Sequence, residues 1–177
     1  MNEELKTIIH EDLQRYLLSI DAIDERMPDA PDLDDKWTAI AEEYIPDGIR
    51  EYNGYPTVAL GWMMYVGMAV AKMWDEDWET YSKHESLYAT LRDKRGYDSM
   101  DEYIREEVLR FEGDEYCAIE KIVAECASRT DANMRRMRIE PATKEAFRAF
   151  MTCLQQLYVF GYSVQLKRMG YRMVQAQ

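Results

Sequence analysis

The stretch of sequence that decides the fold is 58-VALGWMMYVGMAVA-71, which runs for fourteen residues without a charge. A membrane-spanning helix needs about 20 apolar residues, so this stretch is too short to cross a bilayer. A helix that is apolar on nearly every side lies inside a bundle of other helices. Pro56 suits the first turn of a helix, where its missing N–H is not needed. We therefore predict a buried central helix over about residues 56–80.

Segments on both sides of this helix have the apolar spacing of helices that bury one face. Residues 3–23 carry apolar side chains at steps of three and four, which places them on one side of a helix. The same spacing follows Asp32 and Asp114, and it predicts a long C-terminal helix from near Pro141 to about residue 173. Pro46 interrupts the apolar pattern that follows Asp32. We expect the helix to stop or bend there, because proline removes a donor and clashes with the preceding turn.

The composition favours one all-α domain. The 177 residues include 8 glycines and 5 prolines, whereas average usage would give about 12 and about 9. Few turn-forming residues predict few, long elements, and no segment alternates apolar and polar residues as a strand would. A chain of this length can bury a core without disulfides or metals. We predict a single domain, residues 1–177, folded as an all-α bundle of about six helices.

The cysteines and the N-terminus favour a cytoplasmic location. Cys117, Cys126 and Cys153 are odd in number, form no C-x-x-C pair and lie among apolar neighbours, as buried free thiols do. The sequence begins Met-Asn-Glu-Glu, without the basic start and apolar run of a secretory signal. We expect a cytoplasmic protein without a membrane segment.

Charge is unevenly distributed along the chain. A net charge of −12 argues against the basic surface by which proteins bind nucleic acid. Residues 1–35 carry 11 acids and 3 bases, whereas residues 129–177 carry 3 acids and 9 bases. Two explanations remain open: the basic end packs beside acidic helices of the same molecule, or it recruits an acidic partner.

Three carboxylates within 74-WDEDWE-79 form a candidate metal site. If the segment is helical, Asp75 and Glu79 are neighbours four residues apart, and Glu76 lies three residues before Glu79. Mg²⁺ and Mn²⁺ prefer such oxygen ligands. Convergence with Glu42 or Glu43 on one cleft would predict a metal-dependent hydrolase, and a solvated charged surface is the alternative. No cofactor is predicted outside this hypothesis.

Aromatic residues provide a second candidate site. The chain contains 13 Tyr, 4 Trp, 4 Phe and 12 Met, which can fill a core, line a ligand pocket or form a surface for another protein. On the central helix, a ligand pocket would use the aromatic residues Trp62, Tyr65, Trp74 and Trp78.

Motifs for catalysis are not found in the sequence. It has two histidines, which excludes a three-histidine zinc site within one chain, and it lacks phosphate-binding glycine loops and the G-x-S-x-G motif. The favoured hypothesis is therefore a non-enzymatic module that associates with itself or binds a protein partner. A Mg- or Mn-dependent hydrolase and a small-ligand-binding bundle are the alternatives. We expect neither nucleic acid nor membrane as a partner.

Overall fold

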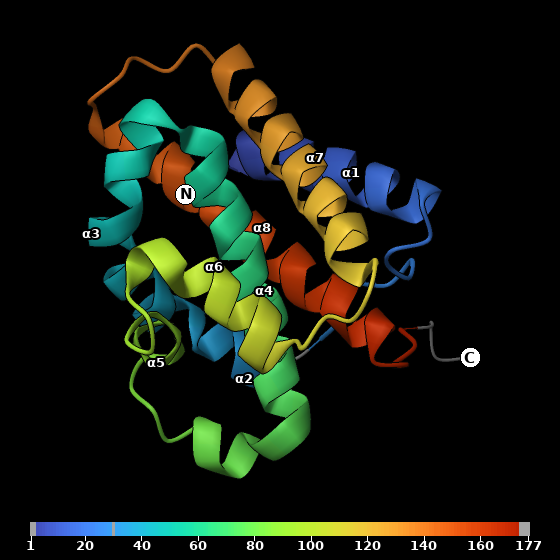
Figure 1. Cartoon of the computed structure of the whole chain (residues 1–177). Coiled ribbons are helices and arrows are strands. Elements are labelled where there is room, and N and C mark those ends of the chain that lie inside the picture. The colour runs from blue at the N-terminus through green and yellow to red at the C-terminus, as the bar shows by residue number, and fades with distance from the viewer. Residues whose placement is uncertain (1–2, 30, 174–177) are drawn as a thin grey trace.

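A central helix and a long C-terminal helix form the core of the fold. The computed structural model describes residues 3–29 and 31–173, and these form an all-α bundle without strands (Figure 1). The helices are α1 (Glu3–Ser19), α2 (Pro31–Asp35), α3 (Trp37–Gly54), α4 (Pro56–Tyr81), α5 (Leu87–Arg92), α6 (Met100–Tyr103), α7 (Glu115–Arg136) and α8 (Lys144–Arg168), with a 3-10 turn at Tyr97–Ser99 and a π turn at Ile104–Val108. Counting α6 and its π turn as one helix, the prediction of about six substantial helices is confirmed.

The predicted central helix is α4, and it is buried as its sequence indicates. Nearly every residue from Ala59 to Ala71 is buried, and Trp62 is the one that is only half-buried. α4 packs most extensively against α8 and next against α7, with α3 and α5 also in contact with it (Figure 1). α1 packs against α7 and α8. The hydroxyl of Tyr158 on α8 donates to the backbone oxygen of Leu33 at 2.6 Å, which ties the short helix α2 to the same core.

α3 does not stop at Pro46, although a stop was one of the two outcomes that the sequence predicted there. α3 runs from Trp37 to Gly54 with Pro46 inside it. Side chains on both sides of the proline are anchored to other helices: the hydroxyl of Tyr44 donates to the oxygen of Ala59 at 2.5 Å, and Asp47 accepts from the hydroxyl of Tyr88 at 2.6 Å. These tertiary contacts favour a continuous helix despite the hydrogen bond that proline cannot donate.

α4 has a break near its C-terminal end that the sequence did not predict. The backbone of Asp77 is non-helical, with φ −162° and ψ 71°. Its carboxylate accepts hydrogen bonds from Thr80, at 3.3 Å from the backbone N–H and 2.7 Å from the hydroxyl. Asp77 therefore caps the last turn of α4, as short acidic side chains do at the start of a helix. The residues after it follow a new helical turn.

Among the described residues, no helix is both long enough and apolar enough to cross a membrane. The three cysteines are free, with Cys117 exposed and Cys126 and Cys153 buried.

Candidate functional site

Two of the four predicted aromatic residues line a groove between α4 and α7. Trp62 and Tyr65 are three residues apart on α4, and they face Tyr116 and Glu120 of α7 across the groove. The groove has a volume of about 380 Å³. We call it the α4–α7 groove; its lining residues are Thr57, Val58, Gly61, Trp62, Tyr65, Asp101, Tyr116, Glu120, Val123, Ala124, Ala127 and Ser128.

Small side chains keep the α4–α7 groove open. Gly61 on α4 faces Val123 and Ala127 on α7. Because these residues are small, the two helices approach closely there and no side chain fills the groove. Trp62 packs its ring against Tyr97, with 4.7 Å between the ring centroids. The aromatic wall is therefore held in place by the core.

Two carboxylates give the α4–α7 groove a negative character. Asp101 of α6 is half-buried and Glu120 of α7 is exposed. Burial raises the pKa of Asp101 above its ordinary value, while the nearby charge of Arg105 partly offsets this effect. Burial also raises the pKa of the Tyr65 hydroxyl, and the neighbouring Tyr116 and Glu120 add to the rise. The guanidinium of Arg105 stacks over the ring of Tyr116, 4.0 Å from the ring centroid.

The other two predicted aromatic residues lie away from this groove. Trp74 is nine residues beyond Tyr65 on α4, a separation of about 13 Å along a helix, and its ring packs on Tyr171 with 5.4 Å between centroids. Trp78 is half-buried against the core and follows the break at Asp77. The predicted set of four thus divides, with Trp62 and Tyr65 together and the other two apart.

The predicted metal ligands Asp75, Glu76 and Glu79 are exposed. Asp75 accepts a hydrogen bond from the Tyr171 hydroxyl at 2.5 Å, and Glu76 pairs with Lys72 at 3.6 Å. Glu43, an expected companion, faces Arg92 at 3.6 Å. Across residues 3–29 and 31–173, no three His, Cys, Asp or Glu side chains are placed to share a metal ion. Nothing in this arrangement adds support to the hydrolase hypothesis.

An apolar groove that the sequence did not predict lies at the end of the bundle where α3 stops and α8 starts. It consists of two adjoining hollows of about 310 Å³ and 250 Å³ that share Tyr52, Asn53, Ala142 and Ala146. The rest of the wall comes from Ile49, Met134, Arg135, Ile139, Pro141, Thr143, Phe147, Ala149 and Phe150. We call this the end groove; the loop from α7 to α8 arches beside α3 at the upper left of Figure 1.

Two large apolar side chains at the end groove are exposed to solvent. Ile49 on α3 is 38% exposed and Phe147 on α8 is 43% exposed. The floor beneath them is ordered by Tyr52, whose ring packs on Phe150 at 4.3 Å between centroids and whose hydroxyl lies 3.4 Å from the sulfur of Met134. These side chains and the apolar hollow beside them make the end groove a candidate binding surface.

The chain around the end groove is basic in an otherwise acidic protein. Residues 135–148 carry five bases and two acids. Arg135 is paired with Asp131 at 2.8 Å. In contrast, Arg138, Lys144 and Arg148 are exposed and make no ion pair with any residue that the structure describes.

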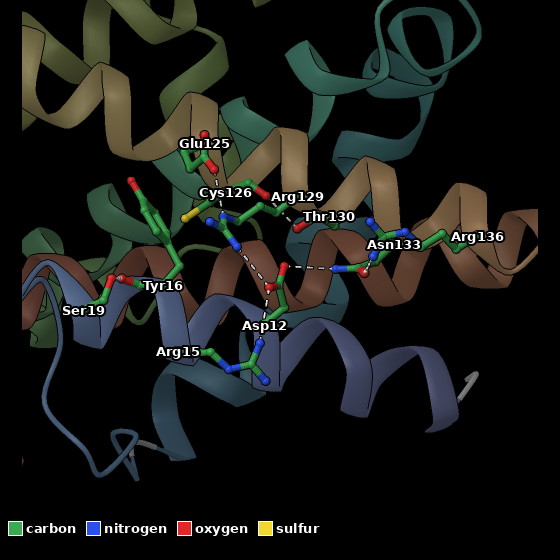
Figure 2. A network of polar contacts seen from close by, with 10 residues as sticks. All are labelled: Asp12, Arg15, Tyr16, Ser19, Glu125, Cys126, Arg129, Thr130, Asn133 and Arg136. Carbon is green, nitrogen blue, oxygen red and sulfur yellow. Dashed lines mark hydrogen bonds and ion pairs between the residues drawn. The ribbon is translucent and has the colours of Figure 1, made fainter.

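A polar network joins α1 to α7 on another side of the bundle (Figure 2). Asp12 of α1 accepts from Arg129 at 3.1 Å and from the amide of Asn133 at 3.1 Å. Arg129 also donates to Glu125 at 2.8 Å and lies over the ring of Tyr16. Each charge in this network has a partner, and burial raises the pKa of the adjacent Cys126 to about 12. The network therefore holds two helices together.

Comparison with protein families, with curated proteins and with solved structures finds no match to this chain.

Proposed function

We propose that the chain is a non-enzymatic, cytoplasmic helical module that binds a protein partner through the end groove. The observation that carries the proposal is the pair of exposed side chains, Ile49 and Phe147, beside a continuous apolar hollow. Aromatic anchors seated in well-packed apolar pockets supply most of the energy of protein interfaces. Phe147 is such an anchor, and the hollow beside it accepts an apolar side chain from the partner.

The charge around the end groove supports an acidic partner. Arg138, Lys144 and Arg148 have no ion pair in the described residues, so an acidic partner gains contacts that the chain itself does not make. The occupant that fits both features is an acidic amphipathic helix with an apolar stripe. A two-fold dimer through the same surface is disfavoured, because it would bring the bases of one copy against those of the other.

Fluorescence anisotropy with two designed peptides tests this proposal. Both peptides are helices of about 20 residues with the same leucine stripe; one has glutamates on the remaining positions and the other has lysines. The acidic peptide is expected to bind at least about tenfold more tightly at low salt, and added salt reduces the difference. Equal binding of the two peptides would contradict the proposal.

Two matched variants locate the binding surface. Phe147→Ser removes the anchor, and Ile20→Ser removes an apolar side chain that is equally exposed, 43% in both cases. Ile20 adjoins Asp21, which pairs with Lys167 at the far end of α8. We expect F147S to abolish binding of the acidic peptide and I20S to leave it unchanged. Sedimentation of the free protein separates the self-association alternative, in which a dimer forms with increasing concentration and F147S dissociates it.

A further inference from the structure

We propose that the α4–α7 groove, separately from the end groove, binds a small organic ammonium ion. Aromatic side chains from two helices and two carboxylates open onto the same hollow of about 380 Å³. This combination of aromatic faces and negative charge is the one by which proteins recognise amines. A volume of this size suits a small molecule and lies within the usual range for ligand sites.

Tyr65 presents an unpaired hydroxyl to the groove. Only 6% of the residue is exposed, and it lines the groove. Its hydroxyl makes no hydrogen bond to any residue that the structure describes. This hydroxyl is not fully buried, unlike that of Tyr97, so it is open to the groove and can bond to a ligand there.

Neither groove carboxylate, Asp101 or Glu120, has an ion-pair partner among residues 3–29 and 31–173, although both face the groove. Glu120 lies beside the Tyr116 hydroxyl, whose pKa is raised by burial and further by Glu120. Arg105 stands at the edge, with its guanidinium over Tyr116 at 4.0 Å and 3.8 Å from Glu106. Because Arg105 is also paired with Glu106, it does not neutralise both groove carboxylates, and a ligand cation would meet uncompensated negative charge there.

The environment of Asp101 supports the same assignment. The side chain is half-buried, and burial raises its pKa because it disfavours the charged form. An ammonium ion beside it would have the opposite effect and favour the carboxylate. Binding and ionisation of Asp101 are therefore coupled, so acidification through the pKa of Asp101 is expected to weaken binding.

Calorimetric titration with 2-phenylethylammonium and its neutral counterpart 2-phenylethanol tests the proposal. The two probes share the same ring, linker and number of non-hydrogen atoms, and they differ in charge. The ammonium is expected to bind with a dissociation constant on the order of 1 mM, as suits so small a molecule, and about tenfold more tightly than the alcohol. No saturable binding of the ammonium, or equal binding of both probes, would overturn the proposal.

Three substitutions place the binding in this groove. Asp101→Asn removes the half-buried charge and is expected to weaken ammonium binding about tenfold, whereas Asp98→Asn makes the same chemical change three residues away, outside the groove lining. Ala124→Leu fills the groove from an exposed position on α7 and is expected to abolish binding. It tests the location of the site without changing any charge. Ammonium binding that survives A124L would show that the site is elsewhere.

Discussion

Gly67 of α4 and Gly161 of α8 lie where the two core helices cross, each against the backbone of the other helix. A Cβ atom at Gly67 would overlap the carbonyl oxygen of Tyr158, and a Cβ atom at Gly161 would overlap that of Met64. The relationship is reciprocal, so the spacing of the two helices is set by backbone contact. Neither helix can take a larger residue there without moving away from the other.

Alanine at either glycine is therefore expected to destabilise the fold. Gly67→Ala and Gly161→Ala should each lower the free energy of unfolding by about 3 kcal/mol, at the upper end of the effects of overpacking, because backbone atoms cannot move aside as a side chain can. Gly54→Ala is the control, since a Cβ atom there meets nothing within 4 Å. Urea denaturation measures all three. A neutral G67A would contradict the close crossing of α4 and α8.

The fold was largely predictable because each of the two core helices can be recognised from its own stretch of sequence. The uncharged run in α4 and the broad apolar face of α8 each indicate burial without knowledge of any neighbour. Helix ends were less predictable. Ile23 fits the spacing of the first helix and is buried, yet α1 ends at Ser19, and the chain reaches Ile23 through Asp21 in the left-handed conformation, with φ 59°. The C-terminal helix was expected to start near Pro141, but Ala142 is in the left-handed conformation, with φ 61°. α8 therefore starts at Lys144, after its cap Thr143.

The sites were only partly predictable because they join distant segments. Trp62 and Tyr65 could be placed together, since they are three residues apart on one helix. Nothing local indicates that Asp101 and Tyr116 face them. Trp74 and Trp78 are four residues apart, but Asp77 breaks the helix between them by bonding to Thr80. The end groove brings together Ile49 and Phe147, which belong to different helices far apart in the sequence.

The network of Figure 2 predicts unequal effects for two neighbouring charges. Asp12→Ala removes the acceptor for Arg129 and Asn133, and it should lower the free energy of unfolding by about 1–2 kcal/mol. Arg15→Ala removes a side chain that is 75% exposed and 3.9 Å from the same carboxylate, so a change below about 0.5 kcal/mol is expected. Urea midpoints compare the two; similar losses would refute the asymmetry.

The cysteines should differ sharply in reactivity. Burial raises the pKa of both Cys126 and Cys153 to about 12, so at pH 8 on the order of one in 10,000 of these thiols is ionised. Cys117 is exposed on α7. An aromatic disulfide reagent is expected to modify one thiol per folded chain rapidly and all three after unfolding in guanidinium. Rapid modification of more than one thiol in the folded protein would contradict the buried positions.

Asp101 predicts a specific dependence of stability on pH. Burial raises its pKa in the folded state above the unfolded value, so the folded protein holds this proton more tightly. The charged form therefore costs stability at neutral pH, and the cost disappears as pH falls through the raised pKa toward the unfolded one. Asp101→Asn should be more stable than the parent at pH 7, with the advantage shrinking toward about pH 4. An advantage independent of pH would contradict this explanation.

Charge reversal at the end groove tests the account of partner binding most directly. Lys144 and Arg148 flank Phe147 on α8 and are both exposed, so Lys144→Glu with Arg148→Glu reverses the local charge without touching the apolar floor. In the anisotropy assay, the double variant is predicted to prefer the lysine peptide over the glutamate peptide, the opposite of the parent chain. A variant that retains the parent preference would show that the end groove does not select an acidic partner.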